Sequence, residues 1–170
     1  MEITLQVAID GVTYISHEEP VWRGEGNQLA MVDLRAFGLE RMLEQLWLRE
    51  ASESGSYAVC CIPFYAYGLA LGDVVRLNAS GGVERLVRKS GRRVLRVLFA
   101  EDRPSADSRS ALREAVDACG LLSEWNGERQ VAIDVLDASI IQPVYDSVQE
   151  EIRNGTAFWE WSDVTQFRSS

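Results

Sequence analysis

The sequence has too few histidines and no cysteine spacing that would predict a metal site. His17 is the only histidine among the 170 residues, and the three cysteines show no Cys-x-x-Cys spacing. Cys60 and Cys61 are adjacent, so in a strand their side chains would point to opposite faces. We therefore expect Cys60, Cys61 and Cys119 to be reduced, mostly buried thiols that pack as small apolar groups. Neither a metal nor another cofactor is predicted.

Long apolar runs and targeting signals are also missing. No stretch of about 18 apolar residues is available to span a membrane. The N-terminal sequence MEITLQVAIDG has neither a basic segment nor an apolar segment of signal-peptide length. We therefore expect a cytoplasmic protein with no membrane partner. Apolar residues make up 46% of the chain, which is enough for a real core.

Positive charge is scarce overall but concentrated in one segment. The formal net charge is −9, which argues against nucleic acid as the main partner. Residues 76–113 nevertheless hold ten Arg and Lys against four Asp and Glu. A basic strip of this kind could steer a charged partner. The interpretation that we favour is a hairpin whose solvent face carries Arg85, Arg88, Lys89, Arg92 and Arg93.

Sequence motifs for phosphate binding and for nucleophilic catalysis are absent. The chain has no Gly-x-Gly-x-x-Gly pattern and no Walker lysine. A catalytic triad or a Cys–His pair would need His17, which lies in a segment without a clear pattern. Asp73 could act as a general base, but a carboxylate in a Gly-Asp turn more often caps backbone N–H groups. We predict no catalytic residues; an enzyme would need Asp73 to converge with Tyr65 or Tyr67.

The second half of the chain shows a regular alternation of strands and helices. Strands are expected at 92–100, 121–125, 130–136 and 156–161. One helix is expected to begin near Pro104 with Ser105 as its N-cap, and a second to have Pro143 in its first turn. The resulting β-α-β-β-α-β order, over about 92–162, is that of a ferredoxin-like unit with both helices on one face of an antiparallel sheet.

The first half predicts mainly strands. We expect a small antiparallel β subdomain over 43–91, with strands at 43–49, 57–62, 74–77 and 83–89. The strand at 57–62 is apolar on both faces and ends at Pro63. Residues 1–42 form a β-rich extension, with strands at 3–9 and 12–16 and either a short helix or a strand within 28–43. The expected architecture is α+β in one compact unit, in which the 43–91 subdomain packs on the ferredoxin-like subdomain, residues 92–165.

Aromatic side chains are the candidate binding residues. Phe64, Tyr65 and Tyr67 lie in the nearly uncharged stretch CCIPFYAYGLALGDVVRL, where they either line a pocket or clamp the two halves of the protein together. Trp159 and Trp161 share one face of the last strand, opposite Phe158. If exposed, the tryptophans would anchor a partner, and if buried they belong to the core; we expect at least one to be buried.

The segment LWLREASESGSYAVCCIPFYAYGLALGDVVRL, residues 46–77, resembles the signature of an uncharacterised bacterial family, the domain of unknown function 4265. The matching motifs are Leu46-Trp47, Ile62-Pro63-Phe64-Tyr65-Ala66-Tyr67-Gly68 and Gly72-Asp73-Val74-Val75. The resemblance covers about residues 43–162 and implies no established activity. Small acidic cytosolic families of this kind often include immunity proteins that neutralise a toxin, which is an analogy at the level of class.

Two main functions remain open at this point. The first is a non-catalytic protein-binding module, an immunity-type inhibitor of one cognate bacterial toxin. Its acidic charge would complement a toxin that is basic where it binds nucleic acid. The alternative is a small-molecule sensor or carrier with a ligand cleft near Phe64–Asp73. The candidate binding residues for both are Phe64, Tyr65, Tyr67, Asp73, Trp159 and Trp161.

Overall fold

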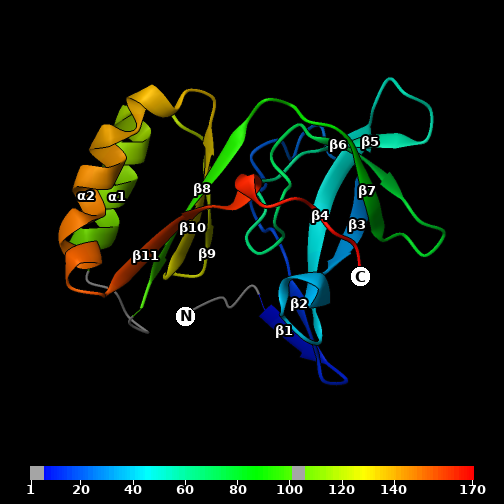
Figure 1. Ribbon diagram of the computed structural model, residues 1–170, viewed down its shortest axis with the longest axis horizontal. Coiled ribbons are helices and arrows are strands. Elements are labelled where there is room, and N and C mark those ends of the chain that lie inside the picture. Colours follow the sequence, from blue (N-terminus) through cyan, green and yellow to red (C-terminus); the bar gives the residue numbers. More distant parts are fainter. Residues whose placement is uncertain (1–5, 101–105) are drawn as a thin grey trace.

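The protein is built from two β-sheets and two α-helices, as shown by a computed structural model that describes residues 6–100 and 106–170 (Figure 1). The α+β class expected from the sequence is therefore confirmed. The first sheet contains β1 (Gln6–Ile9), β2 (Val12–Ile15), β3 (Gln28–Asp33), β4 (Met42–Glu50), β5 (Ser56–Val59), β6 (Val74–Leu77) and β7 (Val83–Arg88). The second contains β8 (Arg93–Phe99), β9 (Ser123–Asn126), β10 (Gln130–Val135) and β11 (Ala157–Trp161). The helices are α1 (Ala106–Ala118) and α2 (Gln142–Arg153).

The first sheet has the strand order β1-β2-β4-β5-β6-β7, and β3 pairs with β4. Strands β4 to β7 pair antiparallel with one another, as predicted for residues 43–91. Strand β2, from the N-terminal segment, runs parallel to β4. Strands β3, β4, β5, β6 and β7 are neighbours in that order. A bridge between Met31 of β3 and Gly82, just before β7, joins the two outer strands of this set. Residues 6–33 thus contribute three strands, β1 to β3, to the same sheet as β4 to β7.

The second sheet has the strand order β11-β8-β10-β9 with antiparallel pairing throughout. Both helices cover one of its faces, and the other face points toward the first sheet (Figure 1). Each of its strands lies within two residues of the predicted bounds, and Pro143 is in the first turn of α2. The predicted N-cap Ser105 and the start of the predicted strand at 3–9 lie outside the described residues.

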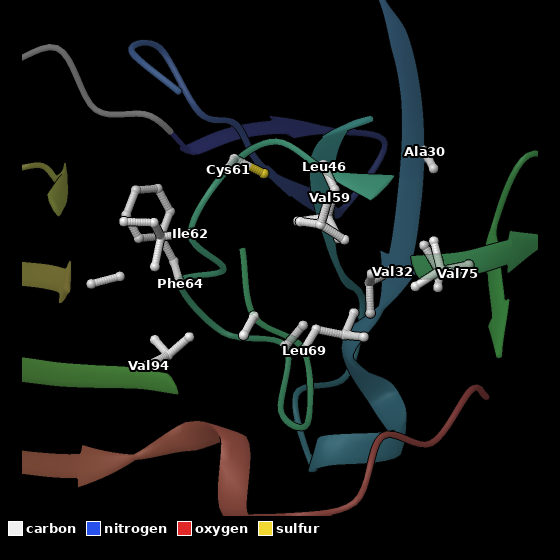
Figure 2. Packing of buried hydrophobic residues seen from close by; sticks show 14 of the residues in the cluster. Ala30, Val32, Leu46, Val59, Cys61, Ile62, Phe64, Leu69, Val75 and Val94 are labelled. Atoms are coloured by element: carbon white, nitrogen blue, oxygen red, sulfur yellow. The ribbon is translucent and has the colours of Figure 1, made fainter. Parts of the chain in front are cut away.

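The chain between β5 and β6 forms the layer between the two sheets. Figure 2 shows Ile62, Phe64 and Leu69 of this loop between Val94 of β8 on one side and Val32 of β3 on the other. All of these side chains belong to one buried apolar cluster, and a second cluster fills the space between the second sheet and the helices. The long apolar stretch in the sequence is therefore an inter-sheet core segment.

Two expectations for individual elements need correction. Strand β5 ends at Val59, so the strand predicted over 57–62 is too long. Cys60 still donates its N–H to Trp47 of β4, but the N–H of Ile62 bonds to the Glu124 side chain instead of a neighbouring strand. The ambiguous segment 28–43 contains β3 followed by a short 3-10 turn, Leu34–Phe37. Gly38 ends this turn with a φ of 83°, a conformation that glycine adopts without a side-chain clash.

The C-terminal segment returns to the first sheet after β11 (Figure 1). Gly68 donates its N–H to the carbonyl of Ser162 at 2.9 Å, and Phe167 packs against the first apolar cluster. A Cβ atom at Gly68 would lie 2.2 Å from the backbone nitrogen of Phe167. The glycine is therefore required where the inter-sheet loop and the C-terminal segment touch.

Candidate functional site

Two buried carboxylates hold the backbone of the loop that follows β5. Glu44 of β4 accepts the N–H groups of three consecutive residues, 64–66, with N···O distances between 2.5 and 2.9 Å. Glu124 of β9 accepts the N–H of Ile62 at 2.5 Å. Pro63 has no N–H, so every backbone donor in this turn is bound to one of the two carboxylates. This pairing satisfies peptide groups that a strand ladder would otherwise satisfy.

The carbonyl groups of the same turn bond to two side chains of the second sheet. Arg96 of β8 donates from Nε to the carbonyl of Pro63 at 3.2 Å and from Nη2 to the carbonyl of Ala66. Gln130 of β10 donates from Nε2 to the carbonyl of Phe64 at 2.7 Å. The loop is thus fixed from both sheets by charged and polar groups that are themselves buried.

His17 links the two carboxylates. Its Nδ1 lies 2.7 Å from Glu124 and its Nε2 lies 3.0 Å from Glu44, while its ring stacks on Phe64 with a centroid distance of 4.2 Å. Burial by itself would lower the pKa of His17, but the hydrogen bonds and charges of Glu124 and Glu44 outweigh it and raise the pKa to about 9. Burial would raise the pKa of Glu44, but the contact with His17 lowers it. The imidazole is therefore a cation that donates from both nitrogens.

A cavity of about 350 Å³ lies between this loop and the helix-free face of the second sheet. Its size falls in the range of small-molecule sites. On the sheet side, Leu98 pairs in register with Phe158 on one flank and Gln130 on the other. Six of the eleven lining residues are aromatic: the cavity is lined by Phe37, Leu39, Phe64, Tyr65, Tyr67, Arg96, Leu98, Gln130, Phe158, Trp159 and Glu160.

The polar groups of the cavity meet at Glu160. The Tyr67 hydroxyl donates to Glu160, with O···O distances of 2.9 and 3.0 Å to its two oxygens. Arg96 Nη1 lies 3.5 Å from Glu160 Oε1, and the guanidinium is 5.1 Å from the centroid of the Tyr67 ring. Burial, and then the contact with Glu160, raises the pKa of Tyr67, so its hydroxyl keeps its proton. The Glu160 side chain is 43% exposed and is the accessible charge of the site.

The structure brings four of the six candidate binding residues to this cavity: Phe64, Tyr65, Tyr67 and Trp159. Trp161 does not line it; this side chain packs against the helix-side core and is partly buried. Trp159 is 44% exposed and lies 5.0 Å, between ring centroids, from Tyr145 of α2. Neither tryptophan is fully buried, contrary to our expectation for at least one of them, because β11 is an edge strand.

Asp73 lies away from the cavity and is fully buried. Its carboxylate accepts the backbone N–H of Ala70 at 2.9 Å and that of Ser90 at 2.7 Å, and it pairs with Lys89 at 2.7 Å. The capping role that the Gly-Asp turn suggested is confirmed. Asp73 does not converge with the two tyrosines that an enzyme of the kind considered would need.

Sequence reasoning did not select the ionic residues that shape the site. Two of them break the apolar pattern of a strand face, since Glu44 alternates in register with the buried Leu46 and Leu48, and Arg96 with the buried Val94. A charge at such a position requires a buried partner, which is a signal that can be read from sequence. His17 carries no such signal, because the segment around it is irregular.

The basic segment 76–113 is distributed over the protein and largely neutralised. The predicted hairpin is wrong, because β7 belongs to the first sheet and β8 to the second. Nine of the ten basic residues lie in the described part of the segment, and six of these nine have a carboxylate within 4 Å, which leaves little net charge there for steering a partner. These pairs are Arg88–Glu53, Lys89–Asp73, Arg92–Asp134, Arg93–Asp163, Arg96–Glu160 and Arg109–Glu128.

The cysteines and the acidic residues form no metal centre among the described residues. Cys60 and Cys61 are buried, Cys119 is partly buried, and all three are free thiols. Burial raises the pKa of both buried thiols. Within 6–100 and 106–170, no group of three or more His, Cys, Asp or Glu side chains is arranged to hold a metal ion. Neither helix in that part of the chain is long and apolar enough to cross a membrane.

Comparisons with known proteins place the chain in a family. A solved structure described as "Novel crystal structure of a hypothetical protein from Neisseria gonorrhoeae" is similar in fold, with a TM-score of 0.59 and 17% identity over 79% of this chain and 93% of that chain. No curated protein matches. A family model described as Domain of unknown function (DUF4265) matches residues 44–161, which confirms the resemblance seen in the motifs of residues 46–77. The chain belongs to this family.

Proposed function

We propose that the protein binds a small organic molecule in the cavity between the inter-sheet loop and the second sheet, as a sensor or carrier. The observation that carries this proposal is the aromatic lining around one accessible carboxylate, in a cavity of about 350 Å³. The wall formed by the loop is held rigidly by Glu44, Glu124, Arg96 and Gln130. A preformed apolar site with a few fixed polar groups is the usual form of a small-molecule site.

A cavity-filling variant tests this proposal. Leu98 lines the cavity and is 40% exposed, so Leu98→Trp would fill the space without removing a hydrogen bond. Leu136 is 65% exposed and does not line the cavity, which makes Leu136→Trp the matched control. In a thermal-shift screen, we expect some metabolites to raise the melting temperature of the unmodified protein. The same metabolites should stabilise the Leu136→Trp control but not Leu98→Trp. An absence of hits with the unmodified protein, or hits that survive Leu98→Trp, would contradict the proposal.

Protein binding is the second candidate, in the form of an immunity-type inhibitor of a bacterial toxin acting in the cytoplasm. Exposed apolar side chains at the edge of the second sheet favour it. Phe158 is 56% exposed and pairs in register with the exposed Leu98, and Trp159, which follows on the other face of β11, is 44% exposed. Exposed aromatic side chains of this kind often act as interaction anchors.

Affinity capture from the host lysate, with and without Phe158→Asp, tests this second candidate. A single stoichiometric toxin that the unmodified protein retains and Phe158→Asp loses would support it. Val87→Asp on β7 is the control, since Val87 is also exposed but lies in the first sheet. A bait that retains no protein, or that retains the same proteins with Phe158→Asp, would count against it.

We also infer that residues 93–161 form a ferredoxin-like unit. Three features support this assignment: the β-α-β-β-α-β order, the strand order β11-β8-β10-β9, and the placement of both helices on one face. An experimental structure tests it, and a different strand order in the second sheet would contradict it.

A further inference from the structure

The charge balance around the cavity indicates which ligands it can accept. The ionic groups that join the loop to the sheets are two cations, His17 and Arg96, and three carboxylates, Glu44, Glu124 and Glu160. This set has one excess negative charge. Glu44 and Glu124 have side chains that are 0% and 3% exposed and are occupied by backbone N–H groups and His17. The excess charge is therefore accessible only at Glu160.

Aromatic residues line the same cavity as that carboxylate. Tyr67 donates to Glu160, and Phe158 and Trp159 precede it on β11. Phe37 lies 5.5 Å from Tyr67 between ring centroids and extends the aromatic wall. The faces of aromatic rings carry negative charge density and attract organic cations, and desolvation in a cavity strengthens this attraction. A carboxylate among aromatic rings thus offers an alkylated ammonium group two attractive interactions: an ion pair with the carboxylate and cation–π contacts with the rings.

The lining does not offer equivalent interactions to an anion. Arg96 is the one cationic residue that lines the cavity. Its Nε and Nη2 donate to the carbonyls of Pro63 and Ala66, its Nη1 faces Glu160, and the residue is 3% exposed. An anionic ligand would have to displace these partners and would also approach Glu160. A neutral ligand would bind the rings but leave the carboxylate without a new partner.

We propose that the ligand of this cavity is an organic cation, an alkylated amine or quaternary ammonium group attached to an apolar body. The inference rests on the proposed small-molecule function and specifies its ligand class. The ammonium group contacts Glu160 and the rings of Tyr67 and Phe158, and the apolar body packs on Leu98 and Trp159.

Three probes of nearly equal size test the charge preference: benzyltrimethylammonium, its neutral isostere neopentylbenzene, and the anion 3-phenylpropionate. Binding is measured by titration of intrinsic fluorescence and by calorimetry at low and moderate salt. We expect the cation to bind at least about tenfold more tightly than the neutral probe, and the anion to bind most weakly. Glu160→Gln should weaken cation binding about tenfold and leave binding of the neutral probe within about twofold. Glu84→Gln, an exposed change on β7, should alter neither.

The possible failures are distinguishable. If the neutral or anionic probe binds as tightly as the cation, and Leu98→Trp blocks it, the charge inference is overturned while the small-molecule function stands. The same holds if Glu160→Gln leaves cation binding unchanged. If none of the three probes binds, or if Leu98→Trp blocks none of them, both the inference and the proposed function are overturned. Unchanged binding of the neutral probe shows that Glu160→Gln is folded.

Discussion

The buried His17 should make the stability of this protein fall as the pH rises above neutrality. The folded protein holds the pKa of His17 at about 9, compared with 6.5 for an unperturbed histidine. Below pH 6.5 both the folded and the unfolded chain carry the proton, so the stabilisation from the two glutamates is fully present. Between pH 6.5 and 9 the unfolded chain loses the proton and the folded chain keeps it. The free energy of unfolding must therefore decrease over this interval.

The size of the effect follows from the difference between the two pKa values. At about 1.4 kcal/mol per pH unit, the interval from 6.5 to about 9 corresponds to about 3–4 kcal/mol. Single domains are typically stable by only about 5–15 kcal/mol, so this is a large share. At acid pH, the lowered pKa of Glu44 makes stability fall as well. The stabilisation from Glu44 is fully present above its ordinary pKa of 4.5 and is lost as the pH falls through its lower pKa in the folded protein.

Urea unfolding at a series of pH values between 6 and 9.5 measures this dependence. The variant His17→Gln removes the imidazole and leaves every other titrating group in place, so it isolates the contribution of His17. We expect a slope of falling stability in the unmodified protein and little slope in His17→Gln, which should also be less stable by roughly 3–5 kcal/mol because two buried carboxylates lose their cation. Since His17 is the only histidine, NMR of the imidazole protons also gives its pKa directly. Stability that stays constant from pH 6.5 to 9, or an imidazole that titrates near 6.5, would refute the reasoning.

Three further changes test the packing of the inter-sheet loop. Gly68→Ala should destabilise the protein by several kcal/mol, because φ is 79° and the new Cβ would clash with the C-terminal segment; thermal unfolding measures this, and a variant as stable as the unmodified protein would contradict the contact. Asp73→Ala should cost roughly 2–4 kcal/mol in urea unfolding, because two backbone N–H groups lose their acceptor, and a loss below about 0.5 kcal/mol would count against the capping role. In the native protein a thiol reagent should modify Cys119 before the buried Cys60 and Cys61; mass spectrometry of the labelled peptides would show the reverse order if the loop opens readily.

The strands and helices of the second sheet could be predicted because their patterns are local. Strand β8 is a short run of valines and leucines interrupted by Arg96, and α2 has Pro143 in its first turn. These signals depend on neighbours a few positions apart in sequence. The Asn126-Gly127 turn between β9 and β10 belongs to the same class of signal, and Gly127 has a φ of 62°.

The inter-sheet loop could not be predicted in the same way, because its hydrogen bonds come from distant positions. The partner of the Ile62 N–H is Glu124, 62 residues further along the chain, and the partner of the Phe64 N–H is Glu44, 20 residues before it. An apolar run whose peptide groups bond to side chains cannot be distinguished from a buried strand by its hydrophobic pattern. Tyr65 and Tyr67 could be selected because they lie in a nearly uncharged, aromatic-rich stretch of sequence. Nothing in the sequence distinguishes Glu160 from the other acidic residues.

The position of a bound probe tests the central claim most directly. With the tightest-binding of the three phenyl probes, intermolecular nuclear Overhauser effects between the probe and the aromatic rings of the protein report which surface it contacts. We predict contacts to Tyr67, Phe158 and Trp159 together, since these rings line one cavity. Contacts confined to Trp159 and Tyr145, on the helix side of β11, or contacts to none of these rings, would contradict a ligand site between the loop and the second sheet.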